Sequence, residues 1–164
     1  MRPRKHSPIQ IRSARADDGP AIAALVEASL ALHARLQPGF FRAGRDDAPL
    51  VVDRHTLVLV AEAPRAGVVG MLRARVYDTP RRAHMAPRRR VMIEDLSVAL
   101  RHRKRGVGRA LVDAARRWSI EQGAAQLLLT LWEGNAGADA FYRALGFVAV
   151  SRVLELELPE KGRP

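Results

Sequence analysis

Apolar residues repeat along this chain with the two periods that distinguish strands from helices. Residues 9–12 alternate between apolar and polar, and residues 56–63 and 68–76 are mainly apolar, so all three stretches are predicted to be strands. The Pro- and Gly-containing turn at 64–67 predicts that the second and third strands form an antiparallel hairpin. An apolar face at helical spacing predicts a helix between the first two strands, starting at Asp17 or Asp18 and ending near residues 38–39.

The second half of the chain predicts strands alternating with helices. A strand at 91–100 is followed by a helix from Val107 to Gly123 and by a strand at 126–132. A strand, a helix and a strand in this order pair in parallel through a right-handed crossover. The near-continuous apolar run at 126–132 predicts a strand buried on both faces, with Trp132 in the core. A helix at 136–145 and two closing strands, at 147–150 and 151–158, complete the pattern.

These elements predict one mixed α/β domain over residues 9–158, with helices on both faces of its sheet. Residues 1–8 are predicted to be a flexible basic tail, and residues 159–164 a C-terminal tail. Residues 40–53 show no clear period and predict a loop that can include a short helix. Residues 77–90 are rich in Pro and Arg and predict a long connection.

Composition excludes several classes of function. The chain has no cysteine, which excludes thiol catalysis, disulfides and a Cys-ligated metal, and its histidines lack metal-binding spacing, so no metal is expected. No apolar run could cross a bilayer, and residues 1–8 lack the apolar core of a secretory signal, so we expect a cytoplasmic enzyme that does not bind a membrane. The net charge of +11 favours an anionic ligand. Nucleic acid is disfavoured as a partner because the basic residues are scattered and few aromatic residues lie among them.

A basic, glycine-containing turn precedes the helix that begins at Val107. It reads Arg103-Lys104-Arg105-Gly106-Val107-Gly108-Arg109. Glycines leave the backbone free to turn and let a ligand approach without a Cβ in the way. The free amides and the positive dipole end of a helix N-terminus attract anions, and the basic side chains add charge. The segment therefore predicts a pyrophosphate-binding turn, with a plain strand-to-helix turn as the alternative.

Together with later positions, this turn makes residues 92–147 resemble the GNAT superfamily of acetyl-CoA-dependent N-acetyltransferases. That family has an Arg/Gln-x-x-Gly-x-Gly/Ala motif, an Asn seven residues before a Tyr, and a Gly-Phe pair after the second helix. These positions are filled here by Arg103, Gly106, Gly108, Asn135, Tyr142 and Gly146-Phe147. The resemblance implies a single GNAT-like domain whose mixed, mostly antiparallel sheet contains a central parallel strand pair. It also implies acetyl-CoA as the co-substrate and an amine as the acceptor.

The resemblance further implies which residues contact the coenzyme. The backbone of Leu96, Ser97 and Val98 would pair with the pantetheine arm like an added strand, and residues 103–109 would hold the pyrophosphate. Asn135 would lie near the coenzyme amides, although Asn is also well suited to cap the helix that follows it. Tyr142 would be the general acid that protonates, or donates a hydrogen bond to, the leaving thiolate, with a buried core aromatic as the alternative.

Two adjacent carboxylates, Glu94 and Asp95, interrupt the apolar strand at 91–100. Neighbours on a strand point to opposite faces, so one acid is expected on each side of the sheet, and a cleft would avoid the cost of burying them. Glu94 is then a candidate base for the amine, directly or through water, while Asp95 and solvent stay open as alternatives. The segment Ile93–Leu96 resembles that of small-amine acetyltransferases in which a glutamate has this role. A structural salt bridge to an arginine is the other interpretation.

The function expected from these residues is acetyl transfer from acetyl-CoA to a primary amine by direct attack, with a small molecule favoured as the acceptor. A protein lysine or N-terminal acetyltransferase, a non-catalytic acyl-CoA sensor and a basic nucleic-acid-binding module remain the alternatives. A homodimer is left open. The candidate specificity segment is 37–53, with possible acceptor contacts from Phe40, Phe41, Arg42, Arg45, Asp46 and Asp47.

Overall fold

The computed structural model describes residues 9–42, 44, 53–79 and 88–158. Their elements, in chain order, are β1 (Gln10–Ser13), the 3-10 turn η1 (Ala16–Asp18), α1 (Gly19–Leu36), β2 (Thr56–Ala63), β3 (Gly67–Asp78), β4 (Arg89–Val98), the 3-10 turn η2 (Leu100–His102), α2 (Val107–Glu121), β5 (Gln126–Leu129) and α3 (Ala136–Ala144).

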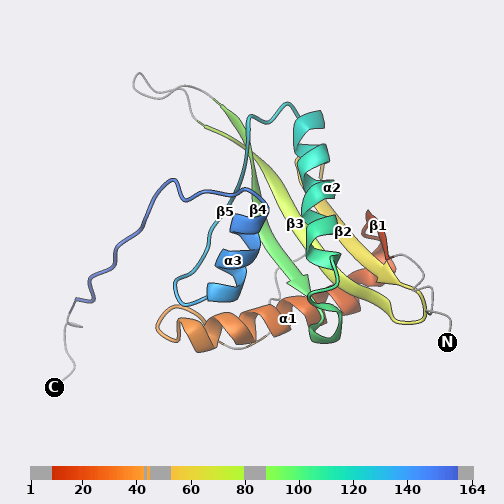
Figure 1. Ribbon diagram of the computed structural model, residues 1–164, viewed down its shortest axis with the longest axis horizontal. Coiled ribbons are helices and arrows are strands. Elements are labelled where there is room, and N and C mark those ends of the chain that lie inside the picture. Colours follow the sequence, from red (N-terminus) through yellow and green to blue (C-terminus); the bar gives the residue numbers. More distant parts are fainter. Residues whose placement is uncertain (1–8, 43, 45–52, 80–87, 159–164) are drawn as a thin grey trace.

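The five strands form one sheet in the order β1-β2-β3-β4-β5 (Figure 1). The first three pairs are antiparallel, and β4 pairs with β5 in parallel. Helix α2 connects the parallel strands, which need a crossover because no tight turn can join them. The predicted mixed, mostly antiparallel sheet with one parallel pair is confirmed.

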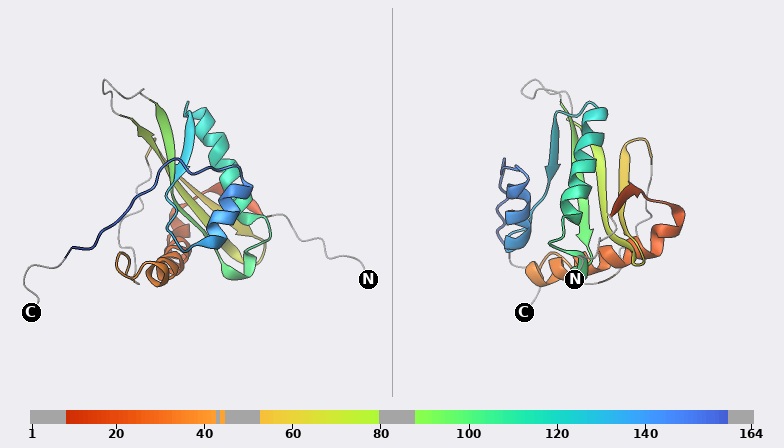
Figure 2. Two further views of the ribbon diagram at one scale, coloured as in Figure 1. Left: turned by 60° about the vertical axis from the view of Figure 1, so that its left-hand side comes forward. Right: turned by 45° about the vertical axis from the view of Figure 1, so that its right-hand side comes forward.

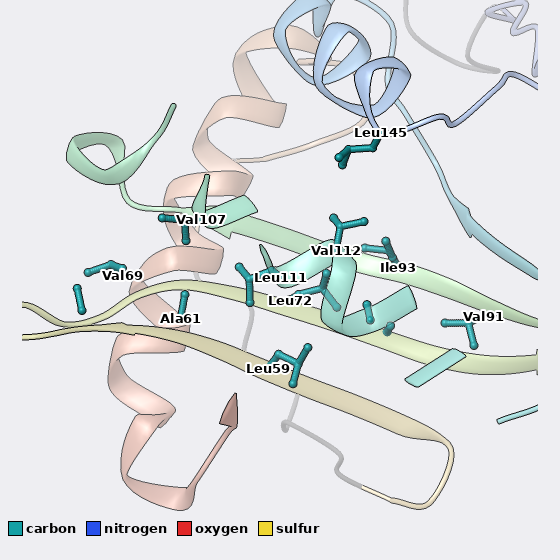
Figure 3. Close-up of a cluster of buried hydrophobic side chains, with 13 residues drawn as sticks. Leu59, Ala61, Val69, Leu72, Val91, Ile93, Val107, Leu111, Val112 and Leu145 are labelled. Carbon is teal, nitrogen blue, oxygen red and sulfur yellow. The ribbon is translucent and has the colours of Figure 1, made fainter. Parts of the chain in front are cut away.

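Alternation along β2 directs its side chains toward helices on opposite faces of the sheet. Val58 and Val60 pack with residues of α1, whereas Leu59 and Ala61 belong to a larger cluster with residues of α2 (Figure 3). Helix α2 runs alongside the strands, and α1 lies across them (Figure 2). The predicted apolar face of α2 is confirmed: Val107 and Leu111 are buried, and Trp118 packs against the cluster at partial exposure.

Helix α1 is attached to the sheet through a charged contact at its start. The guanidinium of Arg12 on β1 donates hydrogen bonds of 2.7 and 2.9 Å to the carboxylate of Asp18, which also accepts the backbone N–H of Arg15. The Arg12 contact lowers the pKa of Asp18 to about 2. Asp18 therefore precedes the helix as predicted, but its carboxylate binds these groups instead of the first amides of α1.

Two register shifts bend the middle of the sheet. Ala61 pairs with Gly70 and Glu62 with Val68, so Val69 is an extra residue of β3. Between β3 and β4, Arg73 pairs with Asp95 and Ala74 with Ile93, so Glu94 is the extra residue of β4. Such β-bulges redirect side chains and are common beside functional sites.

The predictions for the C-terminal part of the chain are partly wrong. Residues 147–150 and 151–158 form no strand, and their large apolar side chains, apart from Phe147, are 75–95% exposed. The run predicted at 126–132 is a strand only over Gln126–Leu129, and its residues are half-buried instead of buried on both faces. Because the closing strands do not pair, the parallel pair lies at the edge of the described sheet instead of its centre. The chain keeps the helix predicted at 136–145, as α3.

The predicted connection at 77–90 is shorter than expected, because β3 extends to Asp78 and β4 begins at Arg89. No helix among the described residues is both long and apolar enough to cross a membrane.

Candidate active site

Strand β5 pairs in parallel along its whole length, but only with the first part of β4. Their register runs from Arg90 opposite Gln126 to Ile93 opposite Leu129, and the chain after β5 then leaves β4 (Figure 2). From Asp95 to Val98, β4 therefore pairs with β3 on one side and, among the described residues, with no strand on the other, while the bulge residue Glu94 has no partner in the register. Backbone groups along that edge are available to a ligand that binds like an added strand.

A cavity of about 380 Å³ lies at this opening. Its walls come from α1, the second half of β4, the turn before α2, the segment after β5, and α3. The predicted site residues that line it are Glu94, Leu96, Ser97, Val98, Arg103, Lys104, Gly108, Asn135 and Tyr142. Arg105, Gly106, Val107 and Arg109 are not on its wall. The side chain of Val107 is buried in the core, so only its backbone can face a ligand.

Two of the lining side chains already form hydrogen bonds to backbone carbonyls of the protein. The hydroxyl of Ser97 donates a 2.9 Å hydrogen bond to the carbonyl of Leu25 and fastens β4 to α1. The Arg103 Nε donates a 2.8 Å hydrogen bond to the carbonyl of Val98. These contacts hold the strand edge and the basic turn in fixed positions.

The basic turn has an unusual backbone. Lys104 has φ 57° and Gly106 has φ 82°, so two left-handed residues lie two positions apart. Gly106 is the N-cap of α2 and has no side chain to bind the first amides of the helix. Those amides and the positive dipole end are therefore available to an anion. Left-handed Lys104 carries strain, which proteins retain mainly at functional sites.

The two glycines of the turn have different structural roles. Gly106 supplies the left-handed conformation, whereas Gly108 lies inside α2 where a Cβ would come within 3.1 Å of the Phe141 ring. The absence of a side chain at Gly108 therefore lets α3 approach α2 closely. The sequence motif includes both glycines, but it does not show that one allows a left-handed turn and the other a close contact between helices.

Helix α3 supplies Asn135 and Tyr142. The Asn135 Oδ1 accepts a 3.1 Å hydrogen bond from the Ala138 amide, which confirms the predicted cap and leaves the side-chain NH₂ group as a donor. Tyr142 packs edge-on against Phe141 and Phe147, with ring centroids 5.0 and 5.5 Å apart. Burial raises the pKa of Tyr142 to about 12, so its phenol is neutral and a hydrogen-bond donor at physiological pH.

The carboxylates of Glu94 and Asp95 are not separated by the sheet, and the expectation that they face opposite sides is wrong. Both line the cavity, and both contact the guanidinium of Arg73, at 3.3 and 2.5 Å. Glu94 also lies 3.6 Å from Arg75. The bulge at Glu94 explains this, because an extra residue breaks the alternation of side chains. The ion pair considered as an alternative for Glu94 is therefore present.

Sequence reasoning did not identify Arg73 and Arg75 as site residues. They lie two apart on β3 and so share a face, but the register between β3 and β4 decides that this face meets the two acids.

The position of Trp132 also differs from the prediction, which placed this residue in the core. It is half-buried on the cavity wall and contacts the rings of Phe40 and Phe41 at 4.6 and 4.8 Å. Phe40 and Phe41 belong to the predicted specificity segment, of which Arg45, Asp46 and Asp47 lie outside the described residues. No group of three metal-ligating side chains that could hold an ion occurs in the parts of the chain that the structure describes.

Comparison with known proteins defines the family. The model of the Acetyltransferase (GNAT) family matches residues 24–147, which is most of the chain. The chain therefore belongs to the GNAT acetyltransferase family. The predicted family and fold are confirmed.

Individual relatives align over shorter or more divergent stretches, and the solved structures among them show the same fold. The streptothricin acetyltransferase of Streptomyces lavendulae is 40% identical over 65 residues, which are 40% of this chain and 34% of that enzyme. The chain thus matches about a third of the length of this relative. A crystal structure of a tetramutant of the BH1408 protein from Bacillus halodurans has a TM-score of 0.81 at 24% identity, covering 91% of this chain and 99% of its own. The aminoglycoside N-acetyltransferase AAC(6′)-Iy in complex with CoA has a TM-score of 0.66 at 20% identity, covering 92% and 99%.

Proposed function

We propose that this protein transfers an acetyl group from acetyl-CoA to a primary amine of a small molecule, by direct attack of the amine on the thioester. The observation that carries the proposal is one cavity that joins the open edge of β4, the basic turn before α2, Tyr142 and Glu94. Family membership supports the acetyl transfer, and a relative of the same fold was crystallised with CoA.

The coenzyme is held at two places. The amides at the start of α2 bind the pyrophosphate, with Arg103 and Lys104 adding positive charge beside them. The pantetheine arm pairs with the open backbone edge of β4 after Ile93 and brings the thioester between β4 and β5. Holding the reacting groups in this way lowers the entropic part of the barrier. The Asn135 NH₂ group lies on the same wall and can donate to an amide carbonyl of the arm.

The amine nitrogen attacks the carbonyl carbon, an N–C bond forms, and the C–S bond breaks. Glu94 accepts the proton that the acceptor must lose, directly or through a water molecule, and Arg73 and Arg75 hold its carboxylate in place. The leaving thiolate is met by the phenol of Tyr142. A simple thiol has a pKa near ~8.5, well below that of this phenol, so a hydrogen bond to the developing thiolate is the main contribution of Tyr142.

Calorimetry with acetyl-CoA and a thiol-release assay with primary amines test this function. We expect Lys104→Glu to weaken acetyl-CoA binding at least roughly tenfold, because it reverses a charge beside the α2 amides. Arg117→Glu is the matched control, since it makes the same charge change on the exposed side of α2. Equal effects of the two variants, or no thiol release with any amine, would contradict the proposal.

A further inference from the structure

Four aromatic side chains form one wall at the mouth of the cavity. His33 on α1, Phe40 and Phe41 after α1, and Trp132 after β5 contact one another in a chain, with ring centroids 4.6–5.1 Å apart. His33 and Trp132 line the cavity directly. We call these four residues the aromatic wall.

The aromatic wall is fastened across two distant parts of the chain. The side chain of Gln37 donates a 3.0 Å hydrogen bond to the backbone carbonyl of Glu133, and the Phe41 amide donates a 2.9 Å bond to the carbonyl of Gln37. The turn after α1 is thus tied to the segment after β5. Phe40 nevertheless stays 65% exposed, so a flat apolar surface remains in contact with solvent beside the cavity.

The cavity next to the aromatic wall has an apolar part, and its carboxylates are offset by basic side chains, to which Arg103 and Lys104 add further positive charge. Leu32 and Leu131 line the cavity together with Trp132. Its two carboxylates, on Glu94 and Asp95, are matched by the guanidinium groups of Arg73 and Arg75. An acceptor with several positive charges therefore meets no excess negative charge among the described residues here, and the net charge of +11 repels it at longer range.

Size limits the acceptor further. The cavity of about 380 Å³ must hold the end of the pantetheine arm as well as the acceptor. That volume is near the lower end for sites that bind a single small molecule. A small amine fits there whole, whereas a branched oligosaccharide or a folded polypeptide would extend outside the cavity.

From these observations, and resting on the proposed function, we infer that the acceptor is a small, singly charged primary amine with an apolar, aromatic body. Its amino group lies beside Glu94, and its body packs against Trp132 and the rest of the aromatic wall. Aromatic pairs at such centroid distances are favourable beyond simple burial of area.

The first test compares kcat/KM for 2-phenylethylamine, ethylamine, spermidine and the aminoglycoside sisomicin. We expect 2-phenylethylamine to exceed ethylamine by at least roughly tenfold, because only its ring reaches the apolar wall. It should exceed spermidine and sisomicin by a similar factor. Equal or higher kcat/KM with either polycation would overturn the inference while leaving the acetyl transfer itself intact.

Two variants test whether the aromatic wall causes the preference for 2-phenylethylamine over ethylamine. Trp132→Ala should remove most of the ratio between 2-phenylethylamine and ethylamine, mainly through KM, since the reacting group is the same in both amines. Tyr77→Ala is the control, because Tyr77 is a half-exposed aromatic residue of β3 that does not line the cavity. A ratio that survives Trp132→Ala would overturn the inference.

Amine binding is measured separately from turnover by tryptophan fluorescence. The chain has two tryptophans, so Trp118→Phe leaves Trp132 as the single emitter. We expect saturable changes in its emission with 2-phenylethylamine and none with spermidine at equal concentration. Binding without thiol release would contradict the proposed function alone, whereas the absence of binding would overturn the acceptor class.

Discussion

The side chain of Tyr142 is partly buried in the protein and is also the proposed hydrogen-bond donor to the leaving thiolate. Packing between Phe141 and Phe147 removes its ring from water, and this loss of solvation raises the pKa of its phenol to about 12. Tyr142 nevertheless lines the cavity. The residue is therefore both a packed aromatic and a hydrogen-bond donor, and the two interpretations that the sequence left open are compatible.

We expect Tyr142→Phe to lower kcat roughly a hundredfold and to change acetyl-CoA affinity little, because only the hydrogen bond to the leaving thiolate is lost. Single-turnover rates and calorimetry would separate the two effects. An unchanged rate in a step shown to be the chemistry would assign Tyr142 to packing alone.

The titration of Tyr142 can be observed directly. In a Tyr77→Phe background, where Tyr142 is the one remaining tyrosine, the ultraviolet absorbance of tyrosinate should appear with a midpoint near pH 12. The folded state favours the neutral phenol, so its contribution to stability is constant below about pH 10, the ordinary tyrosine pKa, and falls as pH rises toward 12. Tyr142→Phe should lack that decline. A midpoint near 10 would mean that the ring is solvated.

Glu94 and Asp95 share Arg73, and this makes their substitutions informative as a pair. Glu94→Gln should lower kcat/KM and shift or abolish the acidic limb of its pH profile, because the base is removed at nearly constant size. Asp95→Asn should leave the acidic limb in place. Any loss of kcat/KM in this variant should come from a changed position of Arg73. A larger effect at Asp95 would transfer the role of base to that residue.

At the level of whole elements, α2 and α3 meet at the lining of the cavity through Gly108 and Phe141. Gly108 on α2 faces the Phe141 ring of α3 at a distance that admits no Cβ without movement. Gly137, in the first turn of α3, has no atom within 4 Å of a built Cβ. Replacing each of these two helical glycines by alanine therefore compares a crowded position with an open one, while helix propensity improves at both.

Gly137→Ala should stabilise the protein by up to about 1 kcal/mol, through better helix propensity and a less flexible unfolded chain. Gly108→Ala should be less stable than Gly137→Ala by about 1–3 kcal/mol, because the added methyl group displaces Phe141 and α3. Urea denaturation of both variants gives the comparison. Equal stability would show that α3 moves away at little cost.

Considered as a whole, the molecule is strongly basic, with a net charge of +11 that its arginines mainly supply. The basic group best suited to an anion is the turn before α2, where Gly106 leaves the first helix amides free and Lys104 lines the cavity. The remaining charge acts at longer range and raises the rate of encounter with an anionic coenzyme.

The KM for acetyl-CoA should therefore rise several-fold between low and high salt, because salt screens the attraction between the basic protein and the anionic coenzyme. The Debye length falls to about 8 Å at physiological ionic strength. The kcat at saturating acetyl-CoA should change little, because the reacting groups lie in a partly closed cavity. Steady-state kinetics in sodium chloride series would measure both. A KM independent of salt would mean that the net charge has no role in coenzyme capture.

The sequence by itself determined the elements that have a strong local pattern. The β2–β3 hairpin, the apolar face of α2 and the cap of α3 at Asn135 follow from side-chain periodicity and from turn and cap residues within a few positions of one another. The basic turn at 103–109 was predicted for the same reason. The alternation at 151–158 is equally local, but a strand also needs a partner edge, and the described chain does not place one beside it.

Only the tertiary structure decided what meets at the cavity. The end of β5 at Leu129 opens the edge of β4, and the bulge at Glu94 turns two adjacent acids toward the same arginine of β3. Trp132 meets Phe40 across more than ninety positions of sequence. Hydrogen-bond register and the packing of distant segments fix these contacts, and neither is encoded in the period of any single stretch.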